Sequence, residues 1–343
     1  MNTWKLLVAV LVLICVLLSA CAPAAIPPVP TLVPPTSIPT AVPTAVVSVV
    51  PATAKVNAEW KVGDPGSIAT GFDSIWVAGH HSYTTTRIDP ASNTVIAVIK
   101  KTGWQAEQAL VVGDALWVTG HREDTTWIDP KTNTVTTSVP PVKGQYHYIA
   151  YGFNSLWATD LDDRLDRIDP VTSQIIASIE LGDGIEGDNN DVLVTATAVW
   201  VDHVVKQELI KIDPATNSIL FKTLYSKLIS DAQALATVPA GKGTDFIWRI
   251  VTGGLLRMDP TTGAGLTFML MASNQFGWAS FAVTDDAVWL AGEGQINRVN
   301  VATNQIDATY ATAPGGTYIC IGFGSVWLAN YDKSLVQRLD VIP

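Results

Sequence analysis

The sequence contains little cysteine. Only three of its 343 residues are Cys, and two of them, Cys15 and Cys21, lie near the N-terminus. Cys320 is the single thiol in the rest of the chain, which excludes a disulfide framework within one molecule. Because Cys320 lies in the apolar run TYICIGF, we expect it to be a small core residue rather than a reactive group.

Basic residues are also scarce. The chain has 21 Lys and Arg against 31 Asp and Glu, which gives a formal net charge of −10. This balance, without a basic stripe, excludes nucleic acid as a partner. Several motifs are missing as well, namely an HExxH zinc motif, an EF-hand loop, a P-loop, a GxSxG elbow and a dinucleotide-binding fingerprint. The sequence thus has no local signature of a metalloprotease, a nucleotide-binding enzyme or a serine hydrolase.

Charged residues are absent from positions 6–54. The apolar run at the start of this region is about 15 residues long, which suits a signal peptide and is short for a membrane span. It closes with the letters LSAC, which end at Cys21 and resemble the lipoprotein box of bacteria. The resemblance implies that residues 1–20 are removed and that Cys21 carries a diacylglyceryl group, which would anchor the protein to a membrane. Two alternatives are an ordinary signal peptide with an accidental Cys21 and an uncleaved N-terminal anchor.

Residues 21–54 have the composition of a linker. Nine of the 20 prolines in the chain lie here, among Thr, Ala and Val. Proline-rich segments favour the extended polyproline II conformation, in which a segment of this length would reach roughly 100 Å. We therefore interpret residues 21–54 as a spacer that begins with the lipidated Cys21 and holds a domain of residues 55–343 away from the membrane, on its extracytoplasmic side.

One pattern recurs along this domain. A Trp within a short apolar run occurs seven times, at spacings of 41, 40, 43, 48, 41 and 38 residues. An Asp-Pro phrase such as RIDPASN or WIDPKTN follows 11 to 13 residues after most of them. Internal repeats of this length are typical of propellers and solenoids. The repeated Trp residues are Trp76, Trp117, Trp157, Trp200, Trp248, Trp289 and Trp327.

Each copy reads as four short strands. In the second copy, QALVVG is a continuous apolar strand, and a Gly-Asp turn joins it to ALWVTG. TTWID follows as the third strand, and TVTTSV alternates like a half-exposed outer strand. Seven such copies predict an all-β, seven-bladed β-propeller with four-stranded antiparallel blades. We expect the repeated Trp residues to pack between neighbouring blades.

The last copy lacks an outer strand. It ends with QRLDVIP, whereas residues 55–62, ahead of the first copy, read as an outer strand without a blade. We therefore predict that residues 55–62 pair with residues near 334–341 and close the ring, which removes a free sheet edge. The longest interval, between Trp200 and Trp248, contains GKGTDF, which we interpret as a loop insertion.

The stretch IWVAGHHSYTTTRIDPASNTVIAVIKKTG resembles the YVTN-type β-propeller repeat, and this resemblance covers residues 55–343. The chain is also similar to virginiamycin B lyase-like (streptogramin lyase-like) propellers. The first resemblance implies a surface or periplasmic protein. The second implies a lyase that opens a cyclic depsipeptide lactone by elimination, with a magnesium ion and with His and Glu side chains on one face. Three residues after the repeated Trp, where such lyases often have an acid, only Asp160 is acidic here, and Glu293 comes one place late.

All five His residues fall at one face of the predicted propeller. Four end the second strand of a blade, and one precedes an inner strand. These positions share a face because neighbouring strands of an antiparallel blade run in opposite directions. Aromatic residues Tyr83, Trp104, Tyr146 and Tyr331 are expected nearby. The residues predicted to form a ligand-binding face are His80, His81, His121, His147, Asp160, His203 and Glu293.

This face supports three interpretations. Its side chains could simply face water, they could bind a ligand or a protein, or they could hold a divalent cation. For a cation we expect His121, His203 and Asp160 as ligands, because imidazole suits Zn and carboxylate suits Mg or Ca. Without such a cation, no cofactor is expected.

We interpret the protein as a monomeric, lipid-anchored propeller that binds a ligand or a protein at the cell envelope without catalysis. A metal-dependent lyase or hydrolase that uses the same face is the alternative. A purely structural surface protein is a third hypothesis.

Overall fold

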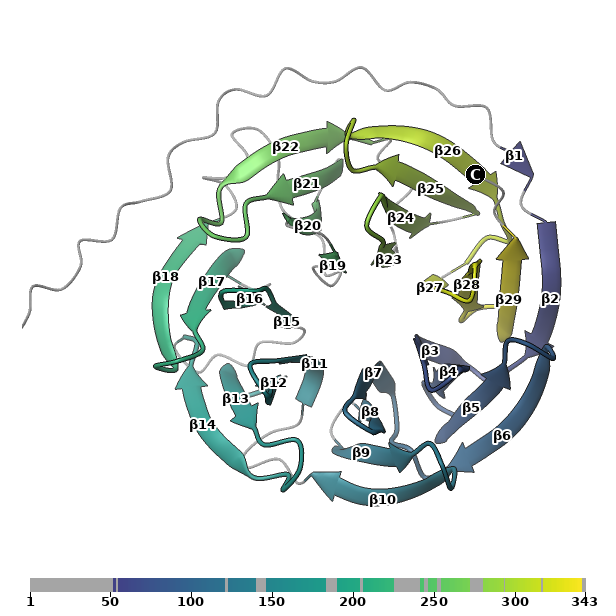
Figure 1. Cartoon of the computed structure of the whole chain (residues 1–343), viewed down its shortest axis with the longest axis horizontal. Coiled ribbons are helices and arrows are strands. Elements are labelled where there is room, and N and C mark those ends of the chain that lie inside the picture. The colour runs from purple at the N-terminus through teal and green to yellow at the C-terminus, as the bar shows by residue number, and fades with distance from the viewer. Residues whose placement is uncertain are drawn as a thin grey trace, which may run out of the picture. The chain divides into compact units, whose positions relative to one another are not determined.

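In a computed structural model of the chain, the described residues form strands joined by turns and loops. They group into seven antiparallel sheets around one axis (Figure 1), which confirms the prediction of an all-β, seven-bladed β-propeller. No helix that could cross a membrane occurs in the described part of the chain. The structure describes residues 52–53, 55–120, 123–139, 146–182, 190–203, 206–224, 241–243, 246–251, 254–271, 280–292, 294–315 and 317–340.

The blades follow one another along the chain, and each runs from an inner to an outer strand (Figure 1). Blade one contains β3 (Pro65–Gly71), β4 (Ser74–Gly79), β5 (Thr84–Asp89) and β6 (Thr94–Lys100). Blade two contains β7 (Ala106–Val112), β8 (Ala115–Gly120), β9 (Glu123–Asp129) and β10 (Thr134–Val139). Blade three contains β11 (Tyr146–Gly152), β12 (Ser155–Asp160), β13 (Arg164–Ile168) and β14 (Ile175–Glu180).

The remaining blades repeat this order. Blade four contains β15 (Asp191–Val194), β16 (Val199–His203), β17 (Glu208–Asp213) and β18 (Ser218–Leu224). Blade five contains β19 (Gly241–Gly243), β20 (Phe246–Val251), β21 (Gly254–Met258) and β22 (Gly265–Leu270). Blade six contains β23 (Ser280–Val283), β24 (Ala287–Gly292), β25 (Gln295–Asn300) and β26 (Gln305–Ala311). Blade seven contains β27 (Thr317–Gly322), β28 (Ser325–Asn330), β29 (Leu335–Asp340) and the N-terminal β2 (Lys55–Lys61).

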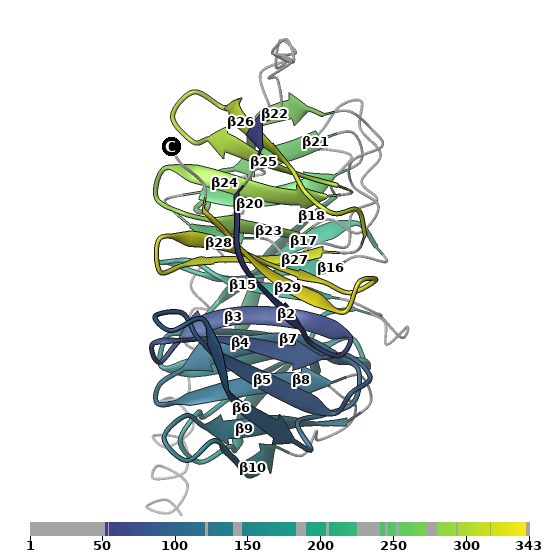
Figure 2. The same ribbon diagram turned by 90° about the vertical axis from the view of Figure 1, so that its right-hand side faces the viewer.

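The N-terminal strand completes the last blade. β2 pairs antiparallel with β29, from Lys55 opposite Asp340 to Lys61 opposite Leu335, and it lies along the outside of blade seven (Figure 2). The backbone N–H of the next residue, Val62, donates to the carbonyl of Ser334 at 3.1 Å. The predicted pairing of residues 55–62 with residues near 334–341 is therefore confirmed.

The sequence does not predict a further N-terminal strand. β1 (Ala52–Thr53) pairs in parallel with β26, with Ala52 opposite Tyr310 and Thr53 opposite Ala311. Blade six is thus a five-stranded sheet. The end of the segment that we interpret as a spacer lies against the rim of blade six before the chain enters blade seven.

The interpretation of GKGTDF as a loop insertion is wrong. Gly241–Gly243 is the inner strand β19 of blade five, and it pairs with β20 from Gly241 opposite Trp248 to Gly243 opposite Phe246. Glycine weakens a strand and removes the apolar pattern that identifies one in a sequence. The inner strand of this blade was therefore not recognisable from its residues.

The repeated Trp residues lie between neighbouring blades, as predicted. Trp76 of blade one packs with Leu116 of blade two, and Trp327 of blade seven packs with Ile75 of blade one. The seven side chains are at most 8% exposed, so each blade buries one large apolar group against the next. Cys320 belongs to the same cluster as Trp327, and burial raises the pKa of its thiol, which confirms it as a core residue.

A cation on the third strand ties one blade to the next. Arg87 is the cross-strand partner of Trp76 and lies 4.6 Å from the centroid of its ring. Its Nη1 donates to the carbonyl of Pro130 at 2.5 Å and to Oδ1 of Asn133 at 2.8 Å, both in the turn of blade two. The third-strand Arg of one blade therefore binds the Asn-containing turn of the following blade. Equivalent contacts join Arg167 to blade four, Arg257 to blade six and Arg338 to blade one.

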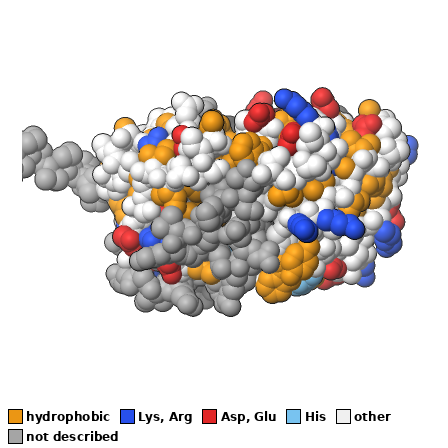
Figure 3. Space-filling view, turned by 90° about the horizontal axis from the view of Figure 1, so that it is seen from below, with side chains coloured by type: hydrophobic (Ala, Val, Ile, Leu, Met, Phe, Trp, Pro, Cys, Tyr) orange, Lys and Arg blue, Asp and Glu red, His pale blue; other side chains and the backbone are white. Residues whose placement is uncertain are grey.

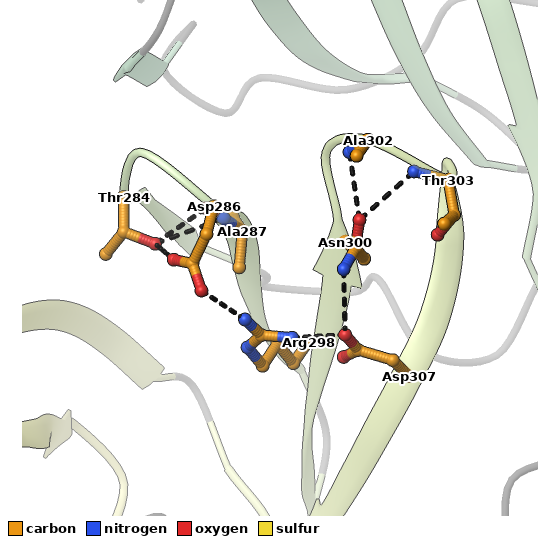
Figure 4. A network of polar contacts seen from close by, with 8 residues as sticks. All are labelled: Thr284, Asp286, Ala287, Arg298, Asn300, Ala302, Thr303 and Asp307. Atoms are coloured by element: carbon orange, nitrogen blue, oxygen red, sulfur yellow. Dashed lines mark hydrogen bonds and ion pairs between the residues drawn. The ribbon is translucent and has the colours of Figure 1, made fainter. Parts of the chain in front are cut away.

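Blade six lacks this contact because blade seven has no turn between its third and outer strands. Arg298 pairs instead with Asp286 and Asp307 of its own blade (Figure 4). The turn residue of blade six is Asn300, whose Oδ1 accepts two backbone N–H groups of the turn and whose Nδ2 donates to Asp307 at 3.4 Å. An Asp at this position would place a second carboxylate beside Asp307 and would repel it, which explains the Asn.

The Asp of each Asp-Pro turn stabilises the turn through its carboxylate. Oδ1 of Asp129 accepts the backbone N–H of Lys131 at 2.8 Å, and Oδ2 accepts the hydroxyl of Thr132 at 3.0 Å. Asn133 adopts a φ of 56°, a left-handed conformation that Asn tolerates better than other side chains. Hydrogen bonds of this kind lower the pKa of four turn carboxylates, those of Asp89, Asp129, Asp169 and Asp213.

These four carboxylates are expected to make the fold sensitive to acid. An unfolded Asp titrates near pH 3.9 and the folded pKa values are lower, so their stabilisation is present above about pH 4 and is lost as the pH falls through the folded values. A variant with all four changed to Asn keeps the acceptor oxygens but does not titrate. Its Tm should therefore fall less between about pH 4.5 and 2.5 than that of the unchanged protein. Identical pH profiles of Tm would contradict this role.

The outer strands form the rim of the ring and expose part of their apolar residues. Val95, Ile96 and Val98 of β6 are 42 to 55% exposed. Over the coloured part of the rim in Figure 3, apolar side chains are interspersed with charged side chains of both signs. Neither sign of charge dominates this part of the rim.

Candidate ligand-binding face

The face predicted from the His residues is one end of the ring. We define the histidine face by the loops between the second and third strand of each blade, together with the loops that lead from an outer strand to the next inner strand. These loops lie at the same end because adjacent strands of a blade are antiparallel. Five predicted residues are described there, namely His80, His81, His147, Asp160 and His203, whereas His121 and Glu293 lie outside the described residues.

Two of the predicted His residues belong to a cluster of four rings. The rings of His80 and His81 meet edge to face with their centroids 4.4 Å apart, and their Nδ1 atoms are 3.4 Å apart. The hydroxyl of Tyr331, from blade seven, lies 3.2 Å from Nδ1 of His81, and Trp104 lies 6.2 Å from the His81 ring. His81 is exposed and the other three are half-buried. We call these four residues the ring cluster.

His203 lies elsewhere, in a buried polar group of blades three and four. Its Nδ1 accepts the backbone N–H of Lys206 at 3.2 Å, and its Nε2 lies 2.8 Å from Oδ1 of Asp163. Asn190 donates to the same Oδ1 at 3.2 Å. The side chains of His203 and Asp163 are at most 1% exposed. A Cβ at Gly182 would come within 2.2 Å of the other carboxylate oxygen, so a larger residue there would displace the Asp163 side chain.

Asp160 is bound within its own loop. Its Oδ2 accepts hydrogen bonds from Nε and Nη2 of Arg164 at 2.9 and 2.5 Å, and its Oδ1 accepts the backbone N–H groups of Asp162 and Arg164 at 3.0 and 2.9 Å. Burial raises the pKa of Asp160, whereas the hydrogen bonds from Arg164 act in the opposite direction. The carboxylate that the lyase resemblance singles out therefore holds a strand connection together through an ion pair with Arg164.

His147 is inside blade three. Its side chain is 3% exposed, and its carbonyl accepts the hydroxyl of Thr119 at 2.6 Å. Tyr146, which was expected near the mouth of the ring, is also buried and donates its hydroxyl to Asp166 at 2.8 Å. Among the predicted face residues that are described, His80 and His81 lie in contact with each other. Within the described ranges, no three His, Cys, Asp or Glu side chains are grouped to hold a metal ion.

A buried ion pair that was not predicted from the sequence joins blades four and five. Arg249 of β20 pairs with Asp202 of β16, and Asp191 is the cross-strand partner of Asp202. Burial lowers the pKa of Arg249 to about 10, although the charge of Asp191 opposes this shift. The repeat itself marks Arg249 as unusual. Blade five reads IWRIV, whereas the other copies have an apolar residue directly after the Trp.

Polar side chains on the inner strands also join neighbouring blades. Oγ of Ser67 accepts the backbone N–H of Ala109 at 2.9 Å, and Oε1 of Gln108 accepts that of Ile149 at 2.6 Å. Tyr318 occupies the equivalent register position of blade seven, and burial raises the pKa of its hydroxyl to about 12. The hydrogen bonds of Ser67 and Gln108 thus satisfy backbone groups at the inner edges of the sheets. On the described part of this face, the ring cluster and Tyr83 present aromatic rings to solvent.

Comparison with known proteins supports the fold and does not identify a family. No protein-family model and no curated protein sequence matches the chain. Among solved structures, a streptogramin B lyase matches with a TM-score of 0.66 and 19% identity, over 82% of this chain and 94% of that chain. BamB from Moraxella catarrhalis matches with a TM-score of 0.54 and 15% identity, over 82% and 83% of the two chains. At such low identity the likeness establishes a shared propeller fold, and a shared fold does not determine function.

Proposed function

We propose that the protein is a lipid-anchored, extracytoplasmic propeller that binds a partner at the cell envelope through its histidine face. The observation that carries the proposal is the ring cluster. His80 and His81 come from blade one, Tyr331 comes from blade seven, and Trp104 leads into blade two. A cluster assembled across blade boundaries, with one ring exposed and three half-buried, has the aromatic and polar groups that anchor ligands in protein interfaces.

The buried polar groups favour binding over catalysis. An enzyme needs a base and an electrostatic partner that converge on one reacting atom. The carboxylate of Asp160 already pairs with Arg164, and His203 contacts Asp163. These groups therefore hold loops of the face in place, and a binding surface requires such rigid support.

Photo-crosslinking in the bacterial host tests the proposed binding face. A photoreactive phenylalanine analogue at Tyr83 or Tyr331 would lie on the histidine face, whereas Val171, which is 79% exposed in an Asp-Pro turn, provides a control on the opposite face. We expect light-dependent mass additions at the two face positions and none at Val171. Equal additions at all three positions, or none at any, would refute a partner-binding role for this face.

Processing of the N-terminus tests the anchor. In Cys21→Ala, both the lipid attachment site and the Cys of the cleavage box are lost, so the protein should lack the diacylglyceryl mass and should keep residues 1–20. Cys15→Ala is the matched control, because that Cys lies within the predicted signal peptide and should not affect anchoring. If Cys21→Ala stays in the membrane fraction and its N-terminal peptide, apart from the substitution, has the same mass as that of the unchanged protein, the lipoprotein assignment is wrong.

A lyase is the second candidate, supported by the fold likeness to a streptogramin B lyase and by the acidic Asp160 at the position that the resemblance marks. The test is incubation of the full-length protein with a streptogramin B and Mg²⁺. Elimination opens the lactone without a change in mass, so the product is an isomer that chromatography separates from the substrate. Enzyme-dependent formation of that isomer would favour the lyase over a binding protein.

A further inference from the structure

We propose that His80, His81 and Tyr331 form a binding site for one divalent transition-metal ion, with Zn²⁺ or Cu²⁺ as the ions of matching chemistry. The biological role of this site rests on the proposed function. A metal ion at the ring cluster could coordinate a donor group of the partner that binds the histidine face. The site differs in all its residues from the group of His121, His203 and Asp160 that the sequence suggests.

The donor atoms already have the spacing of metal ligands. Two ligands that each lie 2.0–2.1 Å from a tetrahedral Zn²⁺ are separated by about 3.3 Å. Nδ1 of His80 lies 3.4 Å from Nδ1 of His81, and the hydroxyl oxygen of Tyr331 lies 3.2 Å from the latter atom. Two of the three donor–donor distances therefore match those of ligands on one ion, and rotation of the side chains would turn the three donors toward a shared position.

The backbone makes this convergence of neighbouring residues feasible. Consecutive side chains of a strand point to opposite sides, but His80 and His81 follow the last residue of β4 and lie in a turn. The backbone N–H of His80 donates to the carbonyl of Asp64 at 2.6 Å, which fixes the turn. Gly66 lies under it, since a Cβ there would come within 3.0 Å of Cβ of His80 and 2.6 Å of the Ala106 carbonyl.

The surrounding rings hold the donors in place. The Tyr331 ring packs edge-on against His80 with their centroids 5.6 Å apart, and Trp104 lies against His81. Metal affinity depends on such support of the ligands by neighbouring groups. Because Tyr331 comes from blade seven and both His residues come from blade one, the site spans the boundary at which the ring closes.

The chemistry of the donors selects the ion. Two imidazoles and a phenol suit Zn²⁺, Cu²⁺ and Ni²⁺, whereas Mg²⁺ and Ca²⁺ prefer carboxylate and carbonyl oxygen. His81 is exposed, so the ion can be reached from solvent. Three protein ligands leave a fourth position of a tetrahedral ion for water or for a donor group of the partner.

Calorimetric titration of the full-length protein in detergent micelles with Zn²⁺ alone tests the site. We expect one ion to bind per chain and the affinity to fall at least about 100-fold in the double variant His80→Gln/His81→Gln, because both nitrogen ligands are lost. Tyr331→Phe should bind several-fold more weakly. The matched controls are Tyr83→Phe, an exposed Tyr on the same face, and His121→Gln, and both should bind Zn²⁺ like the unchanged protein.

Electron paramagnetic resonance with Cu²⁺ gives a second readout that a merely structural role would not produce. Coupling to two imidazole nitrogens is expected for the unchanged protein and should disappear in the double variant, while the metal-free Tm shows that the variant is folded. The proposal is overturned if the unchanged protein binds no Zn²⁺, or if the double variant binds it equally well. Crosslinks at the face without Zn²⁺ binding would refute the metal site but not the proposed function. Zn²⁺ binding without crosslinks would support the metal site and refute the binding of a partner.

Discussion

A chain without residues 1–62 is expected to unfold at a Tm at least about 10 °C below that of a chain without residues 1–54. The two shortened chains differ by β2 and the residue that follows it. β2 supplies the outer strand of blade seven, and Trp60 stacks on Trp327 with ring centroids 5.6 Å apart. Val62, which is 5% exposed, belongs to the cluster between blades seven and one.

The size of this effect follows from what is removed. Truncation of a fully buried Trp costs about 3–5 kcal/mol, and the half-buried Trp60 should contribute part of that amount. A destabilisation of 1 kcal/mol shifts the Tm of a domain of this size by about 2 °C. Loss of β2 removes more than a single side chain, because β29 then becomes an exposed sheet edge. The shorter deletion removes β1, which pairs with blade six over two residues, and should change the Tm little.

Addition of β2 as a peptide distinguishes strand pairing from other effects of the deletion. A peptide of residues 55–62 should raise the Tm of the chain without residues 1–62 in a concentration-dependent way, because it binds only the folded state. A peptide with the same composition in scrambled order is the control. Equal Tm values of the two deletion variants would show that closure by β2 does not stabilise the ring.

The fold was predictable because its determinants are local and repeated. The Trp spacing marks one blade boundary after another, and the Asp-Pro turn has a direct structural reason in hydrogen bonds such as those of Asp129. Even the closure could be deduced, since the last copy lacks a strand and the first is preceded by one. β1 and β19 were not predicted because they are too short to show a periodic pattern. β1 has two residues, and β19 has three, of which two are glycine.

The site was less predictable because its contacts join residues that are distant in the sequence. The shared position of the His residues on one face follows from strand direction, but which of them meet depends on side-chain placement. Tyr331 and His81 are 250 residues apart and become neighbours only through ring closure. In contrast, His203 meets Asp163 in a buried group, and no pattern of residue types separates such a supporting His from one that faces a ligand.

The role of the third-strand Arg is clearest at the closure, where Arg338→Met is expected to destabilise the protein strongly. Nη1 of Arg338 donates to the Pro90 carbonyl at 2.5 Å and to Oδ1 of Asn93 at 2.9 Å, and Nε donates to Ser325 at 2.9 Å. Met preserves the length and the apolar stem but has no donor. Loss of charged donors to partly buried oxygens costs about 3 kcal/mol, so the urea midpoint should fall markedly.

Arg298→Met provides the matched control for this prediction. Cζ of Arg298 lies 5.6 Å from the ring centroid of Trp289, and Cζ of Arg338 lies 5.2 Å from that of Trp327. Both Arg residues therefore make the same contact with the Trp of their own blade. The other described partners of Arg298 are Asp286 and Asp307, whose side chains are 70 and 34% exposed, and exposed ion pairs contribute about 1 kcal/mol or less. The shift in urea midpoint should therefore be at least about twice as large for Arg338→Met. Equal shifts would mean that the contact between blades adds nothing to the packing of the cation on its own Trp.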